Sequence, residues 1–263
     1  MQVETQPVMY SNHGHQGESI ILGQYGQYGS NLDPGEQPKG FGFSNDSIRR
    51  GFIRKVYLIL LGQLVTSLAI ISIMVFNTEL QYAVARNPWV LMISFIMTIA
   101  ILVVLVCNEG LRRQTPANFV LLVCFTIAQS FLLASAACHY APMEVFQAVL
   151  ITAAVCLGLT LFALQTRYDF TMLGGILVAS VIILLFFGIA TMFVGGSLAS
   201  TIYASISAVI FSVYLIYDTQ LMMGGNHRYS ISPEEYIFAA LNLYIDVVNI
   251  FMDILRLIGG SDG

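Results

Sequence analysis

Asn and Asp residues recur at helical spacing close to the C-terminal end of the chain, inside a stretch that is otherwise apolar. They are Asn242, Asp246, Asn249 and Asp253. The spacing i, i+4, i+7, i+11 predicts that the four side chains form a stripe on one face of an α-helix. Another acid, Asp218, stands in the apolar stretch before it. An ionised carboxylate in apolar surroundings is costly, so acids at such places call for an explanation.

Asp218 and Asp246 could act as a pair. Their predicted depths, about 9 Å and about 20 Å from the ends of two helices at about 1.5 Å per residue, allow an antiparallel contact without requiring it. Two carboxylates in a low dielectric cannot both ionise cheaply, so such a pair tends to share a proton. It would be a pH-sensitive latch and, once fully ionised, an oxygen site for a hard cation such as Ca²⁺.

The neighbouring polar residues have simpler alternatives. Asn242 and Asn249 either support the acids as part of a polar stripe or tie helices together by hydrogen bonds. Asp253 can form an ion pair with Arg256, one turn further on. Arg112 and Arg113 are candidate counter-charges that latch the carboxyl pair, or surface arginines that fix the orientation in a membrane.

The composition sets the surroundings of these residues. Of the 263 residues, 57% are hydrophobic and only 10% are charged, whereas a soluble domain has about a quarter of its residues charged. The sequence therefore predicts an integral membrane protein. A formal charge of −4 without a basic stripe argues against nucleic acid as a partner.

The four cysteines lie in apolar runs without a CxxC pair, so we expect small buried hydrophobes: Cys107, Cys124, Cys138 and Cys156.

Apolar stretches of about 20 residues, the length that spans a bilayer, follow one another from Val56 onward. Turn signals such as Asn87-Pro88 and Gly195-Gly196 separate them. The predicted fold is all-α, with six helices wrapped around a central, polar-striped seventh, because the stripe must avoid lipid. We expect helices near 56–76, 89–107, 117–138, 143–164, 171–194, 199–223 and 236–258, and thus a disordered tail over 1–45 and a transmembrane domain over 46–263.

The start of the seventh helix carries a strong local signal. In the sequence Ser232-Pro233-Glu234-Glu235, Ser can cap the helix, Pro suits its first position and Glu at the third can reach back. The polarity of this segment leaves open whether it crosses the membrane or turns back.

Basic residues gather on one side of the predicted helices. The opposite loops hold only Arg86, and Arg256 lies near the C-terminus. By the positive-inside rule the N-terminal tail is cytoplasmic. The residues on that side are Lys39, Arg49, Arg50, Arg54, Lys55, Arg112, Arg113, Arg167 and Arg228.

Three blocks, in this order along the chain, resemble the Bax-inhibitor/lifeguard family, and its lifeguard branch in particular. The first runs from Phe43 to Tyr57, the second from Tyr214 to Gln220 with Tyr217-Asp218 at its centre, and the third from Ala239 to Phe251. The resemblance covers residues 43 to the end and leaves out the tail before residue 40.

The resemblance implies six helices around a central seventh, a pH-dependent Ca²⁺ leak of intracellular membranes that lowers luminal Ca²⁺, and suppression of apoptosis. It implies that Asp218 and Asp246 are the proton-sharing, ion-gating pair, with Ca²⁺ as the transported ion rather than a cofactor. A latching basic residue of bacterial relatives would fall on Arg112 or Arg113. The endoplasmic reticulum, the Golgi, or both are the implied compartment, with the plasma membrane as an alternative.

Two other functions remain to be weighed. The protein could conduct nothing and act as a membrane scaffold that binds apoptosis regulators or other membrane proteins. Intramembrane aspartyl proteases also place two aspartates on successive helices, but they need Gly-x-Gly-Asp at the second, where this chain has Tyr244-Ile245-Asp246. We therefore expect no enzymatic activity.

Overall fold

The computed structural model describes residues 39–224 and 228–260, and it describes side chains from residue 47 onward. Every regular element in these ranges is helical. Seven helical stretches are long and apolar enough to cross a membrane, which confirms the predicted class. The elements are α2 (Lys39–Phe76), α3 (Thr78–Arg86), α4 (Pro88–Cys107), α5 (Glu109–Arg113), α6 (Ala117–Ala137), α7 (Pro142–Gln165), η1 (Phe170–Leu173), α8 (Gly174–Val194), α9 (Ser197–Met223), η2 (Pro233–Glu235) and α10 (Tyr236–Gly259).

Most helices begin and end at the expected turn signals, but α2 begins at Lys39, well before the expected start near residue 56. This start lies inside the predicted disordered tail, the rest of which lies outside the described residues. Pro88 and Pro142 occupy the first turns of α4 and α7, where a missing N–H costs nothing. Gly195 and Gly196, with φ of 65° and 94°, form the tight connection between α8 and α9. The Ser232 side chain accepts a hydrogen bond from the Glu234 N–H, so the predicted cap is present, although a single 3₁₀ turn precedes α10.

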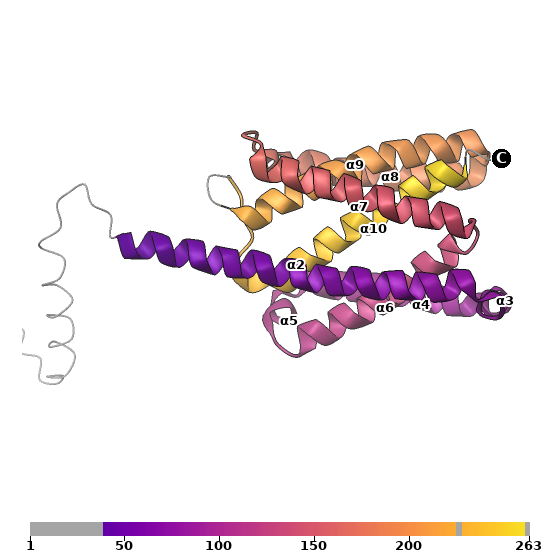
Figure 1. Cartoon of the computed structure of the whole chain (residues 1–263), viewed down its shortest axis with the longest axis horizontal. Coiled ribbons are helices and arrows are strands. Elements are labelled where there is room, and N and C mark those ends of the chain that lie inside the picture. The colour runs from indigo at the N-terminus through magenta and orange to yellow at the C-terminus, as the bar shows by residue number, and fades with distance from the viewer. Residues whose placement is uncertain (1–38, 225–227, 261–263) are drawn as a thin grey trace, which may run out of the picture. The chain divides into compact units, whose positions relative to one another are not determined.

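Helix α10 lies at the centre of the bundle. It crosses obliquely between a group formed by α2, α4 and α6 and a group formed by α7, α8 and α9 (Figure 1). In its most apolar window 61% of the residues are buried, against 44% for α6, the next most buried helix. Helices α6, α7 and α9 pack directly on α10, whereas α4 packs on α6 and α8 packs on α9. The central seventh helix is thus confirmed, with α4 and α8 in an outer position.

Hydroxyl groups connect α2 to the centre of the bundle. Ser67 Oγ lies 2.7 Å from Ser130 Oγ of α6 and 2.8 Å from Tyr244 Oη of α10. One turn away, Gln63 Nε2 donates to Thr126 Oγ1 over 3.0 Å. These buried polar groups have partners inside the bundle, as an apolar surrounding requires.

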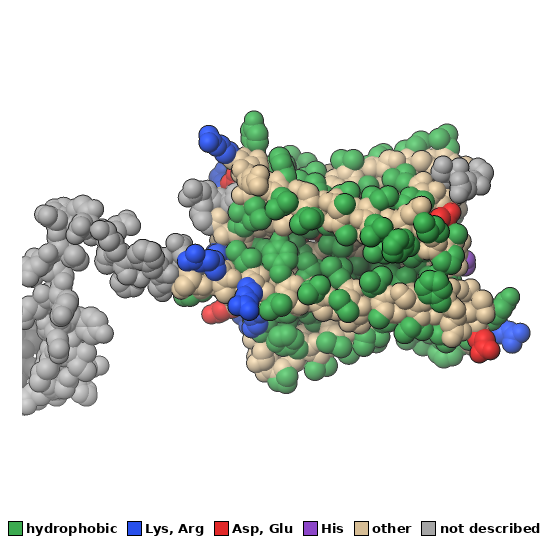
Figure 2. Space-filling view, in the orientation of Figure 1, with side chains coloured by type: hydrophobic (Ala, Val, Ile, Leu, Met, Phe, Trp, Pro, Cys, Tyr) green, Lys and Arg blue, Asp and Glu red, His purple; other side chains and the backbone are tan. Residues whose placement is uncertain are grey.

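The sides of the bundle present apolar residues, and the charged residues gather at its two ends (Figure 2). Such a surface suits hydrocarbon rather than water. The four cysteines are free, but Cys107 is exposed on this surface and the other three are only half-buried. The expectation that all four are buried was therefore wrong, because in a membrane protein the apolar face of a helix can point outward toward lipid.

Helix α10 runs from one end of the bundle to the other. Its start lies beside α5, where Glu235 pairs with Arg113. At its far end, Gly259 faces the Tyr140 ring just before α7 so closely that a Cβ would overlap the ring. The seventh segment therefore crosses the whole bundle and does not turn back.

Candidate functional site

The structure brings Asp218 of α9 and Asp246 of α10 together. Their side chains form a hydrogen bond with each other and are 6% and 3% exposed. Carboxylate oxygens only accept hydrogen bonds, so this contact requires one proton between the two groups. No other described side chain or backbone group donates a hydrogen bond to Asp246 Oδ2, which is buried.

The two sequence segments position these acids by simple geometry. Asp218 lies near the C-terminal end of α9, which ends at Gly224 with a φ of 60°. Asp246 lies about halfway along α10, which returns antiparallel to α9 after a connecting loop. Helix α10 crosses the bundle obliquely, so its middle reaches the end of α9 (Figure 1). This oblique crossing explains the contact between Asp218 and Asp246, which their predicted depths in the two helices allowed but did not require.

Other side chains approach the pair from the neighbouring helices. Tyr214, one turn before Asp218, interacts electrostatically with both acids. Cys156 of α7 interacts with Asp246 in the same way. Among the described residues, no Lys or Arg forms an ion pair with either acid. A shared proton, rather than a basic partner, therefore limits the charge of the pair in this structure.

The two predicted latch residues lie elsewhere. The Nη2 atoms of Arg112 and Arg113 lie 3.3 Å and 2.9 Å from Glu235 Oε1, at the start of α10. Glu109 and Glu234 complete this cluster. Hydrogen bonding to Glu235 raises the pKa of the Arg113 guanidinium above its ordinary value, so Arg113 stays charged. The structure thus joins both arginines to the first turns of α10 and not to the carboxyl pair.

The Arg112 side chain is buried, unlike a surface arginine. Only 8% of it is exposed, and its guanidinium lies 4.4 Å from the centre of the Phe238 ring. This combination of an ion pair and a ring contact fixes α5 against the start of α10.

The other three residues of the polar stripe on α10 differ in their partners. Asp253 is buried, interacts with Ser207 of α9, and has the predicted ion pair with Arg256, at 3.6 Å. Asn249 Nδ2 donates to the Ile245 carbonyl of its own helix over 2.8 Å rather than to a neighbouring helix. Asn242 is half-buried. The acidic members of the stripe therefore face α9, in the interior of the bundle as predicted.

Sequence reasoning missed two partners at the same end of the bundle. Glu235 was interpreted only as a capping residue, although its place in a loop on the same side as Arg112 was a signal of proximity. Arg49 was counted only as a basic residue. Its Nη1 donates to the carbonyls of Met222 and Ile231, at 3.1 Å and 2.8 Å, and so connects α2 to the last turn of α9 and to the α9–α10 loop.

The donor set suits a passing cation better than a resident one. In the described part of the chain, no cluster of three or more His, Cys, Asp or Glu side chains could hold a metal ion. Asp218 and Asp246 offer at most four oxygens, whereas Ca²⁺ takes six to eight. Water or backbone oxygens would have to complete the coordination of a Ca²⁺ ion between them.

These features define a seven-helix membrane protein with a buried carboxyl pair between its last two helices. The family model described as "Inhibitor of apoptosis-promoting Bax1" matches residues 49–263. The chain therefore belongs to the Bax-inhibitor/lifeguard family, which confirms the resemblance seen in its three sequence blocks, and it is not an intramembrane protease.

Curated relatives agree with this membership. The chain is 35% identical to Protein lifeguard 3 of Homo sapiens over 258 residues, which cover 96% of this chain and 79% of the relative. It is 36% identical to the Mus musculus protein of the same name over 219 residues, covering 82% and 71%. It is 32% identical to the Golgi anti-apoptotic protein of Vaccinia virus (strain Lister) over 215 residues, covering 82% and 87%.

Proposed function

We propose that this protein suppresses apoptosis as a pH-sensitive Ca²⁺ leak of intracellular membranes, gated by Asp218 and Asp246. The observation that carries the proposal is the buried hydrogen bond between the two carboxyl groups, which joins α9 near its C-terminal end to the middle of α10 inside the bundle. The anti-apoptotic part rests on family membership and on the name of the vaccinia relative.

The shared proton closes the site. With one proton present, the hydrogen bond holds α9 against α10, and the pair carries a single negative charge. When the proton leaves, two carboxylates at hydrogen-bonding distance repel each other strongly in a low dielectric. They separate, α9 and α10 move apart, and both carboxylates become available to Ca²⁺. The leak therefore increases as the pH rises through the range where the pair loses its proton.

The polar face of α10 provides a route to the pair from one end of the bundle. Asp253 and Asn249 lie two turns and one turn beyond Asp246 and share its face. At the other end, the cluster of Arg112, Arg113 and Glu235 surrounds the start of α10. The salt bridges of this cluster hold α5 against the start of α10, so this end is the barrier that must move for conduction.

The membrane orientation follows from charge. The end of the bundle that holds α5 and the start of α10 carries most of the basic residues, so we assign it to the cytoplasm, together with the N-terminal tail. Because α10 crosses the whole bundle, the C-terminus then lies on the luminal side. The Golgi is the proposed compartment, in keeping with the name of the vaccinia relative, with the endoplasmic reticulum as the second.

Ca²⁺ efflux from proteoliposomes across a pH series tests the gating. In an Asp246→Asn protein the two groups can no longer both become charged, so we expect the pH dependence of efflux to disappear. Glu79→Gln is the matched control, because Glu79 is an exposed acid in the first turn of α3, far from the pair in sequence and in place. This variant should keep the wild-type pH profile.

Unchanged efflux and unchanged pH dependence in Asp246→Asn would refute the gating mechanism. If purified protein also shows no Ca²⁺ efflux at any pH while Asp246→Asn still protects cells, the non-conducting scaffold that binds apoptosis regulators becomes the better account.

A further inference from the structure

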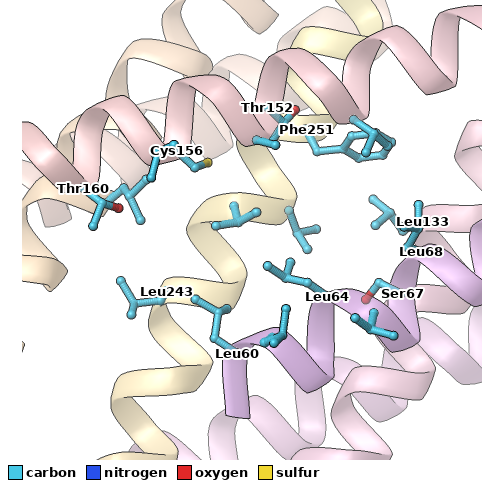
Figure 3. Close-up of a pocket in the computed structure, with 18 of the residues that line it drawn as sticks. Leu60, Leu64, Ser67, Leu68, Leu133, Thr152, Cys156, Thr160, Leu243 and Phe251 are labelled. Atoms are coloured by element: carbon cyan, nitrogen blue, oxygen red, sulfur yellow. The ribbon is translucent and has the colours of Figure 1, made fainter. Parts of the chain in front are cut away.

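An apolar groove opens on the side of the bundle between α2 and α7, with α10 as its floor (Figure 3). Its volume is about 490 Å³, within the range of small-molecule pockets. Leu60 and Leu64 of α2, Cys156 and Thr160 of α7, and Leu243 and Phe251 of α10 point into it from three sides (Figure 3).

The mouth of the groove faces the surface that contacts lipid. Leu61 and Val65 of α2 and Leu157 of α7 line the groove, yet they are 58%, 58% and 63% exposed. In the space-filling view, apolar side chains surround a hollow between these two helices (Figure 2). A molecule in the bilayer can therefore enter sideways without passing through water.

The lining is unsuited to water. Its few polar groups are hydroxyls, and two of them are already satisfied within the bundle. Ser67 bonds to Ser130 and Tyr244, and Thr152 donates to the Ala148 carbonyl over 2.7 Å. The Tyr57 and Thr160 hydroxyls lie together at one end of the groove, and the rest of the lining is almost entirely apolar. Ordered water needs two to four polar partners, so hydrocarbon is the occupant that the chemistry of the groove favours along most of its length.

The shape fits one acyl chain. Along α2 the lining runs from Tyr57 to Ile71, which is about 21 Å at about 1.5 Å per residue. That length exceeds half of a hydrocarbon core of about 30 Å, so a chain anchored at one membrane surface can lie along it.

Two arginines stand above one end of the groove. Arg50 and Arg54 precede Tyr57 by seven and three residues, so they share the helical face that lines the groove. Both are exposed, and neither forms an ion pair with a described side chain, whereas Arg49 turns inward to Met222. Arginine binds phosphate oxygens in a bidentate manner, and exposed basic residues at a membrane surface attract anionic lipids.

We propose that the groove binds one acyl chain of an anionic phospholipid, whose phosphate lies against Arg50 and Arg54. The lipid comes from the leaflet on the side where α2 begins. The groove adjoins the carboxyl pair through Cys156, which lines it, but lipid binding there does not depend on the proposed Ca²⁺ leak.

Photo-crosslinking in liposomes tests the chain site. The full-length protein is reconstituted with a phospholipid that carries a diazirine on its acyl chain, and the labelled residues are mapped by mass spectrometry. We expect adducts to concentrate on the facing sides of α2, α7 and α10. Ala153→Trp, at an exposed wall of the groove, should reduce this labelling severalfold, whereas Ala179→Trp on the outer surface of α8 should leave it unchanged.

The headgroup is tested by comparing phosphatidylserine with phosphatidylcholine probes. A double Arg50→Gln, Arg54→Gln variant should lose the preference for phosphatidylserine, by about fivefold for each arginine. Arg86→Gln, at the opposite end of the bundle, is the control and should retain the preference. The wild-type adduct map needs no variant, so it remains informative if a substitution impairs folding.

Three results would overturn the proposal. Adducts spread evenly over all lipid-facing helices would show that the groove is not a site. Localised adducts without a headgroup preference would show that the lipid is not held by its charge. Crosslinks between two copies through α2 and α7, in place of lipid adducts, would assign the groove to a second copy of the chain.

Discussion

At the scale of single residues, Asp218 and Asp246, two of the acids in the last two spans, are partners of each other. Asp218 and Asp246 satisfy each other with one proton, so neither needs a basic neighbour. Asp253 is stabilised in another way, because it interacts with both Ser207 and Arg256. A titratable group within the bundle is therefore tolerated either by sharing a proton or by charge pairing.

The Asp253–Arg256 pair should contribute little to stability. Arg256 is 36% exposed and lies near the end of α10, so water weakens its attraction to Asp253. We expect Asp253→Asn, which can keep the contact with Ser207, to lower the free energy of unfolding by no more than about 1 kcal/mol. Unfolding of the detergent-solubilised protein measures this, and Glu144→Gln at the same end provides a comparison. A loss of about 3 kcal/mol or more would instead indicate a desolvated ion pair.

At the scale of helices, α2 is attached to the bundle by buried apolar residues such as Phe52 and Val56, by a few hydroxyl contacts and by Arg49. Helices α2 and α7 are partly separated by the apolar groove, which has α10 as its floor. Helix α2 is also among the longest elements, with a candidate span of 30 residues, more than the about 20 needed to cross a bilayer. Its first turns therefore extend into the interface, where Arg50 and Arg54 can meet headgroups.

The hydrogen bond between Ser67 and Tyr244 should couple α2 to α10. A double-mutant cycle of Ser67→Ala and Tyr244→Phe should give a coupling free energy of about 0.6 kcal/mol, with an upper limit of about 1.7 kcal/mol, as found between other membrane helices. Pairing Tyr244→Phe with Ser180→Ala on α8 is the control, because the Ser180 hydroxyl bonds only within its own helix, to Ile176. A coupling of zero for the first pair would show that the contact does not stabilise the bundle.

At the scale of the whole molecule, the number of crossings determines where the termini lie. Seven spans place the two ends of the chain on opposite sides of the membrane, provided that α10 crosses completely. The contact of Gly259 with Tyr140 at the far end of the bundle supports a complete crossing.

Glycosylation mapping should therefore distinguish the two ends. An acceptor sequence added after Gly263 should be modified in the endoplasmic reticulum, whereas one added before Met1 should remain unmodified. Protease protection of tagged termini provides an independent measurement. Modification at neither end, with both tags open to protease from the cytoplasm, would show that the seventh segment turns back.

Local sequence patterns determined much of this protein. A spacing of i, i+4, i+7 depends only on the helical repeat, so the seven helices, the polar stripe of α10 and the Ser232 cap followed from neighbouring residues. The uneven distribution of Lys and Arg between the two sides likewise predicts the membrane orientation without any knowledge of packing. The acids Asp218 and Asp246 stood out because their type contradicts the apolar residues around them.

Only the tertiary structure decided which of these residues meet. The contact of Asp218 with Asp246 depends on the oblique crossing of α10, and crossing angles arise from the packing of all facing side chains rather than from any one segment. For the same reason, the sequence did not predict that Arg112 and Arg113 meet Glu235, or that α2 and α7 leave a groove between them. Sequence supplied the chemical groups and their helical faces, and packing between distant segments determined which of them became partners.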